Sequence, residues 1–133
     1  MKKAGLIIAL ICITLGALFL RVNKIASIPP ALSWDEVSIG YNAYSVLKTG
    51  MDEHGKHFPI DTFVAYGDYK PPLAIYLTIP SVLVFGLTDF AVRFPSALFG
   101  SLTVLVTFFL VMELFGMSKL GKKNIQWIAL LSS

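Results

Sequence analysis

The sequence contains little charge and almost no cysteine. Aspartate, glutamate, lysine and arginine make up 14% of its 133 residues, against about 25% in soluble domains. The net charge is only +3, and the one compact group of lysines lies between residues 119 and 123. A surface that follows a nucleic-acid backbone needs many clustered basic residues, so we expect no nucleic-acid partner. The single cysteine, Cys12, excludes an intrachain disulfide.

Hydrophobic residues, by contrast, make up 56% of the chain, which is typical of a protein that has lipid as its solvent. Two apolar runs are long enough to cross a bilayer. They predict transmembrane helices at about residues 4–22 and 93–116, the second with Glu113 as its only acid. A cleaved signal peptide is the alternative for the first run, but no small-x-small cleavage site follows its apolar core.

A third apolar run begins at Asn124 and is still apolar at Ser133, where the sequence stops. It is too short to cross a bilayer. We interpret residues 124–133 as the start of a third helix, and we expect the chain to be the front part of a longer polytopic protein.

Residues 72–87 are also apolar, but Pro80 and Gly86 interrupt them. This segment either spans the membrane or lies flat on its surface. If it lies flat, the lysines at positions 2 and 3 fall on the same side as those between 119 and 123. This arrangement satisfies the positive-inside rule, and we favour it.

The flat arrangement predicts a protein of the cytoplasmic (plasma) membrane whose N-terminus is cytoplasmic. Residues 23–92 then form one extracytoplasmic loop. Nearly all the acids of the chain lie in this loop, namely Asp35, Glu36, Asp52, Glu53, Asp61, Asp68 and Asp89. We therefore expect the chemistry of the protein to lie in this segment.

The loop contains a clear signal for the start of a helix. The residues Ser33-Trp34-Asp35-Glu36 match the capping box S-x-x-E, in which the serine and the glutamate satisfy each other's backbone N–H groups. Gly50 is well placed to end the helix. Apolar residues recur between these ends at helical spacing, namely Val37, Tyr41, Tyr44 and Leu47. The pattern predicts an amphipathic helix over about 34–49 that rests on the membrane surface.

Asp35 is the acid that the capping box leaves unexplained. Acids are favourable in the first turn of any helix, and Glu36 is accounted for as the capping partner. One capping carboxylate is enough, however. An acid beside Trp34 at a membrane surface is a candidate general base for a hydroxyl nucleophile.

Residues 52–57, Asp-Glu-His-Gly-Lys-His, contain two acids and both histidines of the chain. Carboxylates alone would suit Mg²⁺ or Mn²⁺, and His54 with His57 would suit zinc. The spacing matches no defined zinc motif, and Gly55 and Lys56 are typical of a solvated turn. We interpret the segment as a polar loop.

Lys70 stands just before Pro71-Pro72, which are typical of a helix start. Helix N-termini attract anions, so Lys70 is a candidate phosphate ligand. The alternative is a lysine that extends to the membrane interface without binding a ligand. Arg93, at the start of the second predicted span, has the same two interpretations. Residues 72–87 are the second predicted surface helix.

Several short blocks occur in an order that resembles one family of enzymes, the protein O-mannosyltransferase-like (family 39) glycosyltransferases. These enzymes have the membrane-embedded C-type fold, and the bacterial aminoarabinose transferases of lipid A belong to the same group. The resemblance covers residues 1 to about 117. Its blocks are Pro29-Pro30-x-x-Ser33-Trp34-Asp35-Glu36, Tyr41-Asn42-Ala43-Tyr44, Gly50-x-Asp52-Glu53-x-Gly55, Tyr69-Lys70-Pro71-Pro72-Leu73, Phe85-Gly86 and Ala91-Val92-Arg93-Phe94-Pro95-Ser96-Ala97.

The resemblance implies an all-α, polytopic helical bundle of the C-type glycosyltransferase kind. It implies transfer of a sugar, with inversion, from a polyprenyl-phosphate carrier to a hydroxyl group of a protein, lipid or glycan at the outer membrane face. Some relatives use a divalent metal ion, so a metal cofactor stays open. The alternative is a non-enzymatic small membrane protein whose loop binds lipid or a partner subunit.

The resemblance also assigns roles to residues. It implies Asp35 as a contact of the acceptor or as the catalytic base, and Lys70 as a ligand of the donor phosphate. Arg93 is expected from its charge to be a second ligand of that phosphate. Four further residues belong to the matching blocks and are expected to support the site, namely Glu36, Asp52, Glu53 and Tyr69.

Overall fold

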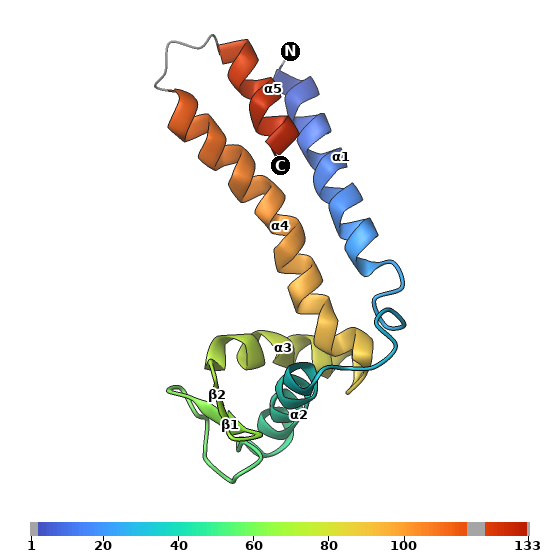
Figure 1. Ribbon diagram of the computed structural model, residues 1–133, viewed down its shortest axis with the longest axis vertical. Helices are drawn as coiled ribbons and strands as arrows, with labels where there is room; N and C mark the ends of the chain where they lie inside the picture. The colour runs from blue at the N-terminus through green and yellow to red at the C-terminus, as the bar shows by residue number, and fades with distance from the viewer. Residues whose placement is uncertain (1–2, 117–121, 133) are drawn as a thin grey trace. The chain divides into compact units, whose positions relative to one another are not determined.

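The computed structural model describes residues 3–116 and 122–132, and these residues are helical apart from one β-hairpin and the connecting loops. The chain divides into a loop unit, Lys24–Pro95, and a second unit that combines the N-terminal helix with the residues from Ser96 onward. The elements follow one another as α1 (Lys3–Val22), α2 (Trp34–Thr49), β1 (Phe63–Ala65), β2 (Asp68–Lys70), α3 (Pro72–Phe85), α4 (Asp89–Gly116) and α5 (Lys122–Ser132) (Figure 1).

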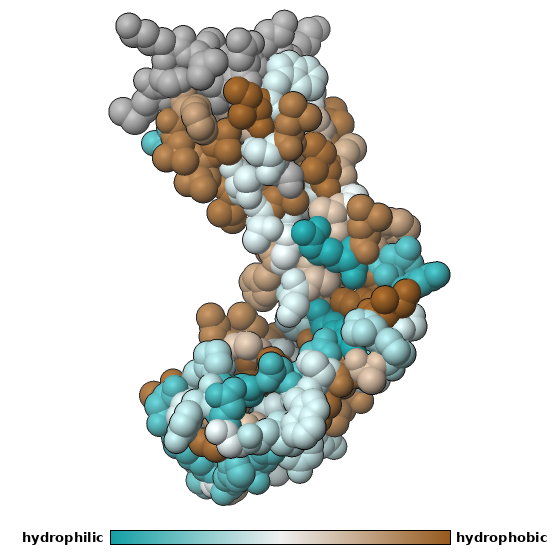
Figure 2. All heavy atoms as spheres, in the orientation of Figure 1, coloured by the Kyte–Doolittle hydropathy of each residue, from teal (hydrophilic) through white to brown (hydrophobic). Residues whose placement is uncertain are grey.

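Helices α1 and α4 are the two helices of the described chain that are long and apolar enough to cross a membrane, over Ala4–Val22 and Asp89–Phe115. Many of their large apolar side chains are exposed. Figure 2 shows this apolar surface in brown, whereas hydrophilic residues gather on the loop unit. Helices that expose many apolar residues need lipid or other helices around them.

Helix α4 begins four residues before the predicted boundary at 93. Thr88 caps it, since its Oγ1 accepts a hydrogen bond from the backbone N–H of Ala91 at 3.2 Å. Asp89 in the first turn suits the positive end of the helix dipole. The apolar span and a short polar start therefore form one continuous helix, and the loop unit ends within it, at Pro95.

The loop unit contains the candidate functional residues. Helix α2 packs on α3, and the hairpin completes the core. The core consists of small or apolar side chains from α2, the hairpin, α3 and the first turn of α4, namely Ala43, Val46, Phe63, Ile75, Val82 and Ala91. This packing gives the loop unit a hydrophobic core of its own.

The hairpin was not among the predicted elements. Strands β1 and β2 pair antiparallel, with Phe63 opposite Lys70 and Ala65 opposite Asp68. Tyr66 and Gly67 form the turn with φ values of 54° and 76°, and two positive φ angles are typical of the type I′ turn of a two-residue hairpin. Strands of three residues are too short to show a periodic pattern in the sequence.

The predicted capping box of α2 is confirmed. Ser33 Oγ accepts from the backbone N–H of Glu36 at 3.3 Å, and the backbone N–H of Ser33 donates to Glu36 Oε2 at 2.8 Å. Gly50 ends the helix with φ 71°, and its N–H donates to the Val46 carbonyl at 2.9 Å. The predicted apolar positions of α2 differ in burial. Val37, Tyr41 and Tyr44 are exposed, whereas Leu47 packs against the core.

Two further boundaries differ from the predictions. Helix α3 ends at Phe85 rather than at residue 87, because Gly86 follows with φ 71°, a conformation that cannot continue a helix. Helix α5 begins at Lys122, two residues before the predicted start of the third helix. Lys2, Lys119 and Ser133, on which the predictions also depended, lie outside the described residues.

Candidate active site

The hairpin brings Lys70 next to Asp35, which is 35 residues away in the sequence. Lys70 is the last residue of β2, and its Nζ donates hydrogen bonds to Asp35 Oδ1 and, at 2.7 Å, to Asp68 Oδ2. Asp68 and Lys70 are two residues apart on one strand, so their side chains leave the same face. Asp35, in the first turn of α2, completes a triad of one cation between two carboxylates.

The triad keeps its lysine charged. The hydrogen bonds from Lys70 to Asp35 and then Asp68 raise the pKa of Lys70 above its ordinary value. The same contact with Lys70 lowers the pKa of Asp68. The side chain of Lys70 is 13% exposed, whereas that of Asp35 is 70% exposed. The site therefore presents an accessible carboxylate with a largely covered cation beside it.

Glu36 is in a different network from its neighbour Asp35. Arg93 Nε donates to Glu36 Oε1 at 2.8 Å, and Arg93 Nη2 donates to Glu36 Oε2 at 3.2 Å. The hydrogen bond from Arg93 is the main reason why the pKa of Glu36 lies below its ordinary value. Glu36 therefore stays ionised, and it caps α2 while it holds Arg93.

The guanidinium of Arg93 is fully occupied. Besides Glu36, it donates to the backbone carbonyls of Ile25 at 2.8 Å, Pro29 at 3.0 Å and Ala31 at 2.8 Å. A guanidinium has five N–H donors, and these contacts use all five. Arg93 is only 6% exposed. Arg93 therefore fixes the segment before α2. In this geometry no N–H group of Arg93 is left to bind a phosphate, the role predicted for Arg93 from the sequence.

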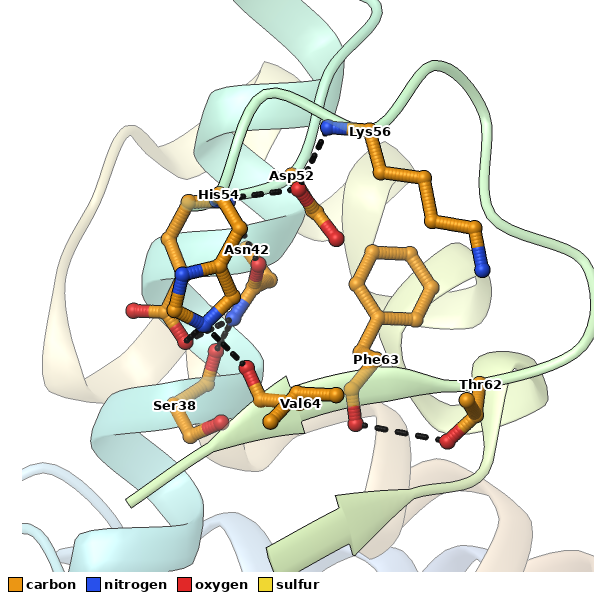
Figure 3. A network of polar contacts seen from close by, with 9 residues as sticks. Ser38, Asn42, Asp52, His54, Lys56, Thr62, Phe63 and Val64 are labelled. Atoms are coloured by element: carbon orange, nitrogen blue, oxygen red, sulfur yellow. Dashed lines mark hydrogen bonds and ion pairs between the residues drawn. The ribbon is translucent and has the colours of Figure 1, made fainter. Parts of the chain in front are cut away.

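Asp52 and Glu53 hold the loop after α2. Figure 3 shows Asp52 with His54, Lys56 and Asn42. Asp52 Oδ1 accepts from the backbone N–H groups of His54 and Lys56 at 2.9 and 2.8 Å. The buried Asn42 accepts from the backbone N–H of Glu53 at 3.1 Å and donates to Glu53 Oε1 at 3.3 Å. These contacts tie the loop to α2, and within the described residues none of them joins Asp52 or Glu53 to the Asp35–Lys70 pair.

The segment 52–57 does not fit a metal centre. Among residues 3–116 and 122–132, no group of three or more His, Cys, Asp and Glu side chains could hold a metal ion. His54 Nε2 lies 2.9 Å from the Val64 carbonyl oxygen, a contact that needs a proton on this nitrogen. The carboxylate of Asp52 already accepts two backbone N–H groups.

Two residues of these networks were not singled out from the sequence. Asp68 shares Lys70 with Asp35, and its signal was the alternation Asp68-x-Lys70 directly before two prolines. Asn42 lies on the buried side of α2, where a polar residue needs partners. Tyr69, predicted to support the site, is exposed and pairs with Val64 across the hairpin.

The chain matches one known family over most of its length. The family model, described as dolichyl-phosphate-mannose-protein mannosyltransferase, matches residues 11–129. The match includes the second half of α1, the whole of α4, the Asp35–Lys70–Asp68 triad and Arg93. No curated protein and no solved structure matches the chain significantly. The chain therefore belongs to the dolichyl-phosphate-mannose-protein mannosyltransferase family, a family of helical, integral membrane glycosyltransferases.

Proposed function

We propose that this chain supplies the catalytic base and the donor-phosphate contact of a glycosyltransferase that takes its sugar from a polyprenyl phosphate. The observation that carries the proposal is the placement of Lys70 between Asp35 and Asp68. The family supports a polyprenyl-linked sugar as donor and a hydroxyl group as acceptor in general terms.

Asp35 is the proposed base. An acceptor hydroxyl must lose its proton as its oxygen attacks the anomeric carbon, and a carboxylate within hydrogen-bond reach can take that proton. Asp35 and Asp68 are both accessible, but Asp68 Oδ1 also accepts a hydrogen bond from the backbone N–H of Tyr69 at 2.8 Å. Glu36 is held by Arg93 and by its own capping contact. Asp35 is therefore the acid with the fewest other contacts. Attack from the face opposite the phosphate inverts the anomeric carbon.

Lys70 is the proposed phosphate ligand. The bond between the anomeric carbon and the phosphate oxygen breaks as the new bond forms, and negative charge builds up on the departing polyprenyl phosphate. A cation placed at that oxygen stabilises the charge. Lys70 keeps its proton at neutral pH, because both carboxylates raise its pKa.

The triad links the two roles. When the donor phosphate takes over the hydrogen bonds of Lys70, the carboxylate of Asp35 is released and can accept a hydrogen bond from the acceptor hydroxyl. Binding of the donor thus frees the group that the acceptor needs, and Arg93 and Glu36 keep the first turn of α2 in place during this exchange.

The loop unit is proposed to lie outside the cytoplasm, because the lysines near both ends of the chain favour the cytoplasmic side. Reporter fusions at Lys56 should be active in the extracytoplasmic space, and fusions at Lys122 in the cytoplasm. A cytoplasmic signal at Lys56 would refute the orientation without affecting the chemistry of the triad.

The donor contact can be tested by comparing two lysines of the loop unit. Lys56 also forms an ion pair, with Asp61 at 2.6 and 2.8 Å, outside the triad. In the active enzyme that contains this chain, Lys70→Gln should weaken binding of a polyprenyl-phosphate sugar at least about tenfold, which is the effect of losing one strong contact. Lys56→Gln is the matched control and should leave binding unchanged. Equal effects of the two substitutions would rule out Lys70 as the phosphate ligand.

A further inference from the structure

The hairpin is connected to α2 by polar contacts at two levels of the helix. The first connection is the ion pair of Lys70 with Asp35, in the first turn of α2. An ion pair with one exposed partner holds two segments together only weakly. The second connection begins at Asn42, about two turns further along the helix, and reaches strand β1 through residues 53 and 54. The second connection contains no residue of the triad.

Asn42 is the fixed end of the second connection, and its side chain is completely buried. Its Nδ2 donates to the Ser38 carbonyl at 3.1 Å and to Glu53 Oε1 at 3.3 Å, while its Oδ1 accepts from the backbone N–H of Glu53 at 3.1 Å. If the amide group were turned over, donors would face donors and acceptors would face acceptors. Asn42 therefore fixes both the backbone and the side chain of Glu53 relative to α2.

His54 follows Glu53 directly and completes the connection to the hairpin. Its backbone N–H donates to Asp52 Oδ1 at 2.9 Å, and Figure 3 shows its ring directed toward β1. The ring Nε2 donates to the Val64 carbonyl at 2.9 Å and lies 3.8 Å from Glu53 Oε1. Both the neutral ring with its proton on Nε2 and the charged ring can donate this hydrogen bond. The contact therefore does not depend on the charge of the ring.

Val64 is next to the residue of β1 that pairs with Lys70. That residue is Phe63, which lies opposite Lys70 in the hairpin and is buried in the core. His54 holds the following residue of the same strand from outside the two-stranded sheet. Two fixed points on one strand determine its direction, and they thereby determine the position of the paired strand that contains Lys70.

The second connection becomes important when the first is broken. In the proposed function, the donor phosphate takes over the hydrogen bond that Lys70 donates to Asp35, and the hairpin then loses its ion pair with the first turn of α2. We propose that His54 is a positioning residue, which holds β1 so that Lys70 stays within reach of both Asp35 and the donor phosphate. The effect on catalysis rests on the proposed function, whereas the effect on the hairpin does not.

The first experiment measures the position of the hairpin without any reaction, by NMR titration of the Lys70 side chain in detergent micelles. The hydrogen bond to Asp35 is the largest cause of the raised pKa of Lys70. His54→Ala should therefore lower this pKa toward its ordinary value of 10.5. His54→Gln, whose amide N–H can still donate to the Val64 carbonyl, should keep most of the shift. His57→Ala is the matched control, because His57 is an exposed histidine of the same segment, and it should leave the pKa unchanged.

The three variants should have the same helix content by circular dichroism, because the side chain of His54 is 58% exposed and lies outside the core. An unchanged pKa of Lys70 in His54→Ala would overturn the proposal, and so would an equal shift in His57→Ala. A shift in His54→Gln as large as that in His54→Ala would exclude the hydrogen bond as the cause. Loss of helix content in His54→Ala would also overturn the proposal, since His54 would then support the fold as a whole.

The second experiment measures donor binding and transfer in the active enzyme that contains this chain. His54→Ala should weaken binding of a polyprenyl-phosphate sugar about 2- to 10-fold, the range of one hydrogen bond, and should change the rate at saturating donor less. His54→Gln should restore binding, and His57→Ala should leave it unchanged. If the pKa of Lys70 falls in micelles but donor binding does not change, His54 positions the hairpin and the proposed role of Lys70 is wrong. If the pKa does not fall, the positioning role itself is wrong, whatever the donor does.

Discussion

The first turn of α2, which carries Asp35, is held by two interactions that can be removed one at a time. Ser33→Ala removes only the hydroxyl that accepts from the backbone N–H of Glu36. The reciprocal bond, from the backbone N–H of Ser33 to Glu36 Oε2, survives this change. Glu36→Gln keeps the shape and an acceptor oxygen for the cap, but it removes the charge that pairs with Arg93.

The structure ranks the two substitutions. Loss of an N-cap costs about 0.5–2 kcal/mol, and the 3.3 Å bond of Ser33 is long, so we expect about 0.5–1 kcal/mol for Ser33→Ala. Hydrogen bonds to charged groups contribute about 1.5–3 kcal/mol, and Glu36 accepts two from Arg93. Because Glu36 is partly exposed, we expect a loss near the lower end, about 1.5–2 kcal/mol, for Glu36→Gln.

The pH dependence gives an independent signature. Arg93 lowers the pKa of Glu36 below its ordinary value of 4.5. The carboxylate therefore contributes stability above pH 4.5, and this contribution is lost as the pH falls through the lower pKa of the folded state. Glu36→Gln should lack this acidic decline, whereas Ser33→Ala should keep most of it.

The assay is the free energy of unfolding in detergent micelles, measured between neutral pH and pH 3 by circular dichroism. Ser45→Ala, the same chemical change further along α2, is the matched control and should have little effect. The reasoning would be refuted if Ser33→Ala destabilised the protein more than Glu36→Gln, or if Glu36→Gln kept the full acidic decline.

Three further predictions concern the loop unit. Phe63→Ala should lower the free energy of unfolding by about 3–5 kcal/mol, because Phe63 is fully buried in the core; a loss below 1 kcal/mol in urea unfolding, on the scale of a surface change, would contradict this packing. Gly50→Ala should cost at least about 1 kcal/mol, because Gly50 has φ 71° and a new Cβ would lie 2.9 Å from two ring carbons of Phe58; thermal unfolding checks it, and an unchanged midpoint would argue against the turn. Asp68→Asn should lower the pKa of Lys70 toward its ordinary value of 10.5, since it removes one of the two carboxylates that raise it. The stability that the raised pKa provides is present below pH 10.5 and is lost as the pH rises through the folded pKa. The free energy of unfolding of the variant should therefore decrease less at alkaline pH than that of the wild type. NMR titration of the Lys70 side chain measures the pKa shift, and an unchanged pKa would exclude the contact.

The parts of the fold that depend on local sequence were predictable. The capping box and Gly50 determine the ends of α2 through contacts within a few residues, and both ends are found where the pattern places them. The hairpin was not predictable, because each strand has three residues and Tyr66 is an unusual residue for its turn position. The surrounding core, and not local propensity, stabilises this hairpin.

The candidate site was likewise predictable only in part. The chemistry of the sequence drew attention to Asp35 and Lys70 separately, and only the family resemblance indicated that they belong to one site. Their contact depends on the hairpin, which lies between them in the chain. The contacts of Arg93 could not be predicted from the sequence. Its position suggested a phosphate ligand, but its five acceptors come from segments 57 to 68 residues away, and no local pattern reveals such a set.

The central claim is that Asp35 takes the proton from the acceptor, and sugar transfer by the Asp35→Asn variant tests it most directly. Asparagine keeps the shape of the side chain but is not a base. Asp61→Asn is the matched control, because Asp61 also pairs with a lysine of the loop unit, Lys56, outside the triad. In the active enzyme, with both variants purified and folded, transfer by Asp35→Asn should fall about 10²- to 10⁴-fold, and Asp61→Asn should stay near the wild-type rate. Transfer by Asp35→Asn at a rate close to that of Asp61→Asn would contradict the claim.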